Sequence, residues 1–376
     1  MGKYKLINNV LGWIVFAIAS TVYLMTMEPT ASFWDCGEFI SSAYKLEVGH
    51  PPGAPFFMLT ANLFTQLASD PSTVAKMVNT MSALFSGLTI LFLFWSITHL
   101  ARKIMVKDGE EASLGQMITV MGSGLVGALA YTFSDTFWFS AVEGEVYAYS
   151  SLFTAVVFWL ILKWEAVADK PHADRWIVLI AYLMGLSIGV HLLNLLCIPA
   201  IVLVYYYKKF PNPTMKGTLV ALLASFAIVA LMMYGVVQGL VEVCGYFELL
   251  FVNVLGMPYN SGVFAYVIIV AGVLIWSIWE TMRDEIHPTR MKIAFILSVV
   301  LIGIPFIGSG YVLAVILTAA LSLYLFKSKK VDIKTLNTIL VCLMVVVVGY
   351  SSYALTLIRA TADTPMNQNA PSDIFT

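Results

Sequence analysis

Runs of about 20 apolar residues recur along almost all of this chain of 376 residues, and they constrain its fold more than any other feature. A run of that length can cross a bilayer as an α-helix, which satisfies its own backbone polar groups where no water is present. Hydrophobic residues make up 60% of the sequence and charged residues 11%, far from the balance of a soluble domain. The sequence therefore predicts an all-α polytopic membrane protein with one domain over residues 1–376.

We expect about eleven transmembrane helices. Two pairs of apolar runs are short, and we divide them at turns near Gly189–His191 and Gly308–Gly310. The first division keeps the basic segments 163–175 and 208–216 on one side of the membrane, which a single crossing between them could not do. The predicted spans are residues 8–27, 76–101, 116–135, 147–164, 176–190, 192–207, 217–237, 262–281, 291–307, 309–326 and 335–356.

The distribution of basic residues orients the chain. With a cytoplasmic N-terminus, the only Lys and Arg residues in outside segments, of 21 in the chain, are Lys45, Lys76 and Arg359. Lys and Arg concentrate in cytoplasmic loops of membrane proteins, so this orientation is the favoured one. The extracytoplasmic segments then include the long loop 28–75, residues 238–261 and the tail 357–376. Because loops on a rigid scaffold carry most binding and catalysis, we expect the functional site on this face.

The first outer loop, 28–75, holds two carboxylates three residues apart, Asp35 and Glu38. Ser32 would cap a helix that starts at Phe33, which would place both carboxylates on one face, about a turn apart. The segment Gly49-His50-Pro51-Pro52-Gly53 would end this interfacial helix, since proline lacks the amide donor. A second amphipathic piece is expected over 55–68, and Asp70 and Pro71 are expected to begin the next span.

Each of these polar residues also has a structural interpretation. The stretch from Ser32 to Asp35 fits a capping box, and an acidic residue in a first turn complements the helix dipole. Glu38 can simply be exposed on an interfacial helix, and His50 can be a turn residue. The local pattern leaves catalysis and capping open for Asp35.

Longer motifs resemble a known family. The pattern Pro29-Thr30-x-x-Phe33-Trp34-Asp35-x-Gly37-Glu38 with Gly49-His50-Pro51-Pro52-Gly53 resembles the bacterial relatives of the animal transmembrane protein O-mannosyltransferases, which are GT-C-type glycosyltransferases. Weaker matches extend the resemblance over essentially the whole chain: Glu143-Gly144-Glu145-Val146-Tyr147, Gly185-Leu186-Ser187-x-x-x-His191, and Ile358-Arg359-Ala360 with Pro365, Asn367, Asn369 and Pro371. It implies a GT-C-like helical bundle in a bacterial inner membrane, with interfacial helices in the first outer loop.

The resemblance also implies an activity. Such enzymes are inverting glycosyltransferases that move a sugar, here mannose or another hexose, from a polyprenyl-phosphate carrier to an extracytoplasmic acceptor. Protein Ser/Thr is the expected acceptor, and a lipid or glycan is the alternative. An acceptor hydroxyl is a poor nucleophile, and a nearby carboxylate can take its proton in the transition state. By resemblance Asp35 is that base, and Glu38 positions the acceptor or supports Asp35.

Five further residues are candidates for binding the donor or acceptor. Arg359 is a rare outside base that could hold the lipid phosphate bidentately, or it could snorkel as an anchor. Glu145 either binds sugar hydroxyls or caps the following helix. His191 contacts phosphate or acceptor, or bonds a neighbouring backbone group. Tyr147 is either a sugar contact or an interface aromatic. His50 completes the set.

No cofactor is expected. The outer carboxylates Asp35, Glu38, Glu143 and Glu145 could gather around a divalent ion, but the enzymes resembled here work without one, so no metal is predicted. Cys36 and Cys244 both lie outside and could pair, although free thiols are expected. The expected partners are the lipid bilayer, the lipid-linked donor and the acceptor, with no nucleic acid.

Two other classes of protein remain as alternatives. Transporters and lipid flippases also carry acidic residues and broken helices in the membrane. Against that class, the predicted spans hold very few ionisable groups and show no inverted repeat. A non-catalytic scaffold is the third possibility. Members of the family resembled here continue further, so a chain that stops at Thr376 is either a short homologue or a piece of a longer protein whose missing part recognises the acceptor.

Overall fold

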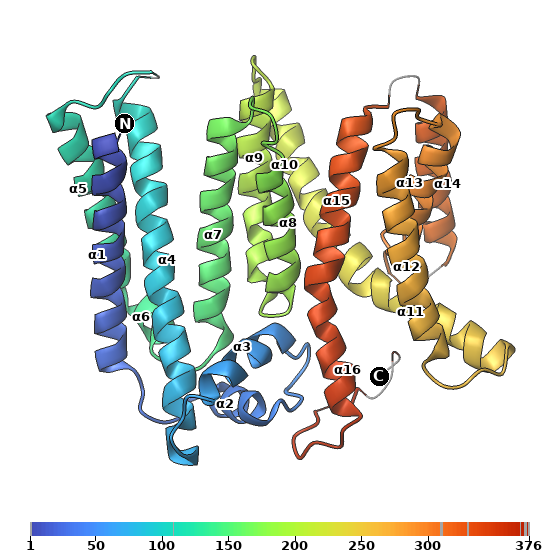
Figure 1. The fold of residues 1–376 in the computed structure, drawn as a ribbon, viewed down its shortest axis with the longest axis horizontal. Helices are drawn as coiled ribbons and strands as arrows, with labels where there is room; N and C mark the ends of the chain where they lie inside the picture. Colours follow the sequence, from blue (N-terminus) through green and yellow to red (C-terminus); the bar gives the residue numbers. More distant parts are fainter. Residues whose placement is uncertain are drawn as a thin grey trace.

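The computed structural model describes residues 2–107, 109–308, 311–328, 331–368, 370, 371 and 374. Helices dominate these residues, and an isolated β-bridge joins Val48 to Asn367. Long helices stand side by side, with the N-terminus at one end of the bundle and α16 (Ala354–Ala360) at the other (Figure 1). The predicted class, an all-α polytopic membrane protein, is confirmed.

Each predicted span coincides with a helix, but not every helix is long. Within the described residues, eight helical segments are long and apolar enough to cross a bilayer: Gly2–Thr26, Pro71–Met105, Leu114–Thr132, Val146–Val167, Leu192–Lys209, Met215–Val254, Ser261–Glu280 and Ile333–Ala360. The other three, α8 (Arg175–Ile188), α13 (Pro288–Leu301) and α14 (Tyr311–Lys327), have only 14, 14 and 17 residues. The count of eleven crossings therefore stays a prediction.

The structure describes the first of the two predicted turns in full and the second only in part. α8 ends at Ile188 and η2 (Leu192–Cys197) begins four residues later, ahead of α9 (Ile198–Lys209), so the turn at Gly189–His191 is confirmed. The second predicted turn lies between α13 and α14, and its residues 309 and 310 are outside the described part of the chain.

Glycines let α8 approach α15 (Ile333–Tyr350) closely. A Cβ added at Gly185 would lie 2.4 Å from the carbonyl oxygen of Val346, and one at Gly349 would lie 2.5 Å from the amide nitrogen of Leu186. Small residues allow such backbone contact between membrane helices. The crossing brings the end of α8 beside the first outer loop, where the carbonyl of Gly189 accepts a hydrogen bond from the amide of Phe56 at 2.7 Å.

The sequence predicts a loop over 238–261, but residues 239–254 are helical. One helical segment runs through α10 (Met215–Ala230), the π-helical η3 (Leu231–Gln238), α11 (Gly239–Leu249) and the π-helical η4 (Leu250–Val254), before α12 (Ser261–Glu280). Its lower part runs obliquely away from the bundle (Figure 1). Gly239 lies within this helical segment, where the lack of a side chain allows close packing. A Cβ there would lie 2.2 Å from the carbonyl oxygen of Gly303.

The first outer loop folds into short helices at the end of the bundle opposite the N-terminus: α2 (Cys36–Lys45), α3 (Pro55–Thr65) and η1 (Pro71–Thr73) (Figure 1). The helix start predicted at Phe33 is wrong: Trp34 has a φ of 59°, and α2 begins at Cys36, three residues after Phe33. The prediction for Asp70 is confirmed, since its carboxylate accepts a hydrogen bond from the amide of Ser72 at 2.9 Å.

The apolar faces of α2 and α3 pack onto the N-terminal parts of α4 (Val74–Met105) and α7 (Val146–Val167). Burial of these side chains removes apolar surface from solvent and fixes the loop on the bundle. The buried set includes Phe39, Ile40, Phe57, Met58, Val78, Met81 and Val146. Polar residues at the start of α2 are thereby held at one fixed place. α5 (Leu114–Thr132) and α6 (Asp135–Ala141) complete this side of the bundle.

Candidate functional site

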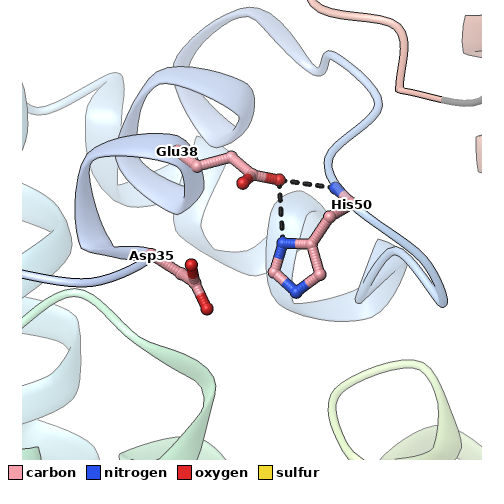
Figure 2. Close-up of side chains that lie close together, drawn as sticks. All are labelled: Asp35, Glu38 and His50. Atoms are coloured by element: carbon pink, nitrogen blue, oxygen red, sulfur yellow. Dashed lines mark hydrogen bonds and ion pairs between the residues drawn. The ribbon is translucent and has the colours of Figure 1, made fainter.

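Glu38 and His50 are joined across the loop. One carboxylate oxygen of Glu38 accepts a hydrogen bond from the His50 backbone amide at 2.5 Å and lies 3.0 Å from Nδ1 of the same residue (Figure 2). Gly49 allows this approach, because a Cβ there would lie 2.7 Å from the same oxygen. Two predicted site residues, 12 positions apart in sequence, are thus in direct contact.

Asp35 stands next to this pair and is exposed. One ligand-type atom each from Asp35, Glu38 and His50 lies within 4.8 Å of the other two, and Figure 2 shows the Asp35 carboxylate beside the His50 ring. Asp35 occupies the N-cap position of α2, but its side chain makes no capping hydrogen bond. The prediction of a capping hydrogen bond at Asp35 is therefore wrong, although the carboxylate still lies at the positive end of the helix dipole, and it is exposed.

A second group adjoins the first through Cys36, the residue after Asp35, and the sequence indicated its glutamates but not Cys36 as their neighbour. The Cys36 sulfur and carboxylate oxygens of Glu143 and Glu145 lie within 4.8 Å of one another. Cys36 is fully buried, and Glu143 and Glu145 are 2% and 8% exposed. The Cys36 sulfur lies beside Glu143, whose Oε2 is buried and has no hydrogen-bond partner among the described residues.

Gly144 explains how the two glutamates reach this place. A Cβ on Gly144 would lie 2.9 Å from Asn79 Oδ1, 3.0 Å from Val78 and 3.1 Å from Ile40, so the turn is wedged between α4 and α2. A glycine between two glutamates in an outer turn is a signal that could have identified Glu143.

Burial controls the protonation of this inner group. It raises the pKa of Glu145 to about 7, and the negative charges of Glu143 and Asp35 add to the effect while His50 opposes it. Burial and the same acidic neighbours raise the pKa of the Cys36 thiol to about 12. Cys36 therefore stays protonated, and Cys36 and Cys244 are both free thiols, as expected. A carboxyl that titrates near neutral pH is suited to proton transfer.

Both acidic groups also contain the residue types that bind metals. Asp35, Glu38 and His50 form one possible ligand set, and Cys36, Glu143 and Glu145 form the other. The same carboxylates can instead accept hydrogen bonds or a proton from a substrate hydroxyl.

His191 and Tyr147 lie together. Their ring centroids are 5.4 Å apart. His191 Nδ1 accepts a hydrogen bond from the amide of Leu193 at 3.1 Å and so caps η2, and burial lowers the His191 pKa. One ring nitrogen thus has a structural role. Glu145 is the N-cap residue of α7 but makes no capping hydrogen bond, so the capping interpretation of Glu145 is wrong.

Arg359 lies at the other end of α2. Its Nε donates to the carbonyl of Leu46 at 2.6 Å, and Nη2 donates to that of Lys45 at 3.2 Å. A small hollow beside it is also lined by Glu47, Gly53 and Thr356. Arg359 therefore contacts the first outer loop, and its described hydrogen bonds go to backbone carbonyls of that loop.

Comparison with known proteins supports the resemblance inferred from the motifs. Residues 35–214 match the family model described as the protein O-mannosyl-transferase TMEM260 N-terminal domain. Protein O-mannosyl-transferase TMEM260 of Mus musculus is 28% identical over 174 residues, which cover 46% of this chain and 22% of the relative. Its namesake in Dictyostelium discoideum is 25% identical over 187 residues, 48% of this chain and 21% of the relative. No solved structure matches.

The similar region includes Asp35 and every other predicted site residue except Arg359. The predicted resemblance to transmembrane protein O-mannosyltransferases of the GT-C type is confirmed. The matched part of the chain spans only about a fifth of the length of each of these relatives.

Proposed function

We propose that this protein is an inverting glycosyltransferase that moves mannose or another hexose from a polyprenyl-phosphate carrier to Ser or Thr of an extracytoplasmic protein. The observation that carries the proposal is the gathering of Asp35, Glu38, His50, Glu143 and Glu145 around the start of α2, at one end of a membrane bundle. The similarity of residues 35–214 to protein O-mannosyl-transferases supports the reaction class.

Asp35 acts as the general base in this proposal. Its carboxylate is exposed and makes no capping bond, so it can take the proton of the acceptor hydroxyl. The hydroxyl oxygen then forms a bond to the sugar C1 as the bond from C1 to the phosphate oxygen breaks. The electron pair of that bond leaves with the lipid phosphate. A single displacement of this kind inverts the configuration at C1.

The neighbouring residues hold the reactants. Glu38 and His50 support the base, because their contact fixes the first turn of α2 against the following loop. Glu145, Tyr147 and His191 bind the sugar or phosphate of the donor.

We assign the remaining nitrogen of Arg359 to the lipid phosphate, which suits a guanidinium at headgroup depth. No step in the scheme uses a metal ion.

We place the site on the extracytoplasmic face of a bacterial inner membrane. The positive-inside distribution supports a cytoplasmic N-terminus, and α2 and α3 lie at the opposite end of the bundle (Figure 1). A lipid-linked donor would then approach Asp35 from the outer leaflet.

The test is sugar transfer in membranes that contain the protein. A radiolabelled polyprenyl-phosphate mannose and a Ser/Thr-rich peptide should give a labelled peptide whose anomeric linkage, read with linkage-specific mannosidases, is opposite to that of the donor. Retained configuration would contradict the single displacement. Movement of labelled lipid across sealed vesicles, with no transfer from any hexosyl donor, would instead indicate a flippase.

A further inference from the structure

We infer that the C-terminal tail, residues 359–368, is a positioning element that holds Glu38 and His50 in contact. The tail is hydrogen-bonded to Leu46 and Val48, in the short segment that runs from the end of α2 to His50. The effect on sugar transfer rests on the proposed function, whereas the attachment itself can be tested without it.

Arg359 fixes the first point of attachment. The last carbonyls of a helix lack partners within the helix. In α2 the Arg359 side chain supplies donors to two such groups, the carbonyls of Lys45 and Leu46. Leu46 has a φ of 51°, the left-handed conformation that commonly ends a helix. The guanidinium therefore anchors α16 to the C-terminus of α2.

The tail backbone fixes the second point. The amide of Val48 donates to the carbonyl of Met366 at 3.0 Å, and the amide of Gln368 donates to the carbonyl of Val48 at 3.1 Å. Both backbone groups of Val48 are thus paired with the tail. Within the tail, Asn367 Nδ2 donates to the carbonyl of Ala360 at 2.9 Å, which ties the paired stretch back to α16.

Only one residue separates this attachment from the acidic site. Val48 is held by the tail, a Cβ at Gly49 would lie 2.7 Å from the Glu38 carboxylate, and the His50 amide and ring both contact that carboxylate. Two residues span at most about 7 Å, so this short link cannot absorb a displacement of Val48. Loosening the tail should therefore displace His50 from Glu38 and disturb the turn that carries Asp35.

A matched pair of variants at residue 368 isolates the backbone contact. Gln368→Pro removes the amide that bonds Val48, while Gln368→Ala keeps the amide and removes only the side chain. Proline is compatible with an extended preceding residue, and Asn367 lies in a β-bridge. We expect faster amide hydrogen exchange of residues 46–54 in Gln368→Pro and wild-type exchange in Gln368→Ala.

Transfer activity supplies the second measurement. Misplacement of a site by about 1 Å can cost on the order of 100-fold in rate, so we expect kcat to fall by roughly tenfold or more in Gln368→Pro while the donor KM changes little. Unchanged exchange in Gln368→Pro would overturn the attachment. Faster exchange with an unchanged kcat would overturn the positioning role.

Arg359→Ala provides an independent check if Gln368→Pro does not fold. It should also speed exchange in residues 46–54, because α2 loses its C-terminal partner. A raised donor KM with unchanged exchange would mean that Arg359 serves only the donor and would overturn the inference for this residue. If wild-type protein transferred no sugar, the proposed function would fail, and the exchange results would still decide whether the tail holds the loop.

Discussion

Glu143 and Glu248 are two glutamates of nearly equal burial, 2% and 3% exposed, with very different surroundings. Glu248 in α11 accepts hydrogen bonds from the amides of Asn260 and Val263, at 2.6 and 3.1 Å, so each oxygen serves the start of α12. Glu143 has one buried oxygen without a described partner, and a second carboxylate, Glu145, lies beside it.

The difference separates a structural carboxylate from one available for chemistry. A buried charge is tolerated when backbone amides surround it, as they do at Glu248. Crowding Glu143 and Glu145 together without such donors costs stability, and a buried carboxyl with a raised pKa, such as Glu145, is typical of functional sites. We therefore expect Glu248 to serve the fold and Glu143 to serve the site, although both are buried glutamates.

The largest stability effect should come from Glu248→Ala. Two amides at the start of α12 would lose their acceptors, which should cost about 2–4 kcal/mol. Thermal unfolding in detergent would show this as a lower Tm, and Glu248→Gln should fall between alanine and wild type. An unchanged Tm in Glu248→Ala would break the structural half of the comparison.

Glu143→Gln should reduce sugar transfer without lowering the Tm, unlike Glu248→Ala. It keeps the shape of the side chain and removes a carboxylate that forms no ion pair among the described residues, so we expect the Tm to stay the same or rise. Sugar transfer should fall several-fold, because the inner acidic group would be altered next to Asp35. A loss of Tm comparable to that of Glu248→Ala would show that Glu143 is also structural.

The pH dependence of stability sharpens the same point. The folded-state pKa of Glu145 is raised to about 7, above that of an ordinary glutamate, so between these values the folded protein binds more protons than the unfolded chain. This residue should therefore contribute less stability as pH rises from about 5 to 7. Between pH 5 and 7 the Tm should fall less in Glu145→Gln than in wild-type protein. Identical dependence of the Tm on pH in the two proteins would contradict a raised pKa of Glu145.

Removal of divalent metal should have the smallest effect. We expect transfer after treatment with EDTA to equal that of untreated membranes, since the scheme uses no metal. A loss that is restored by one added cation would instead make the acidic groups metal ligands. Glu143→Gln and Glu38→Gln would then show which group binds it.

The sequence was informative where local pattern determines structure. Apolar runs located the helices, the Asp70-Pro71 pair correctly marked the start of η1, and Gly189–His191 correctly marked a turn. Motif resemblance brought Asp35, Glu38 and His50 together, and the structure places them within 4.8 Å.

Tertiary contacts decided what the sequence could not show. The partners of Arg359 are backbone carbonyls more than 300 residues away, and no local signal predicts them. Burial of Glu143 and Cys36 follows from the wedge at Gly144 between two helices. The segment 238–261 looked like a loop by composition, but packing of Gly239 against Gly303 accompanies a continuous helix.

The most direct test of the central claim compares Asp35→Asn with Asp70→Asn in the radiolabelled transfer assay, at equal amounts of folded protein. Both aspartates are exposed in the first outer loop, and asparagine at position 70 can still cap η1. General base catalysis contributes about 10²–10⁴-fold, so Asp35→Asn should lose activity on that scale while Asp70→Asn remains near wild type. Equal transfer by the two variants would contradict the assignment of Asp35 as the base.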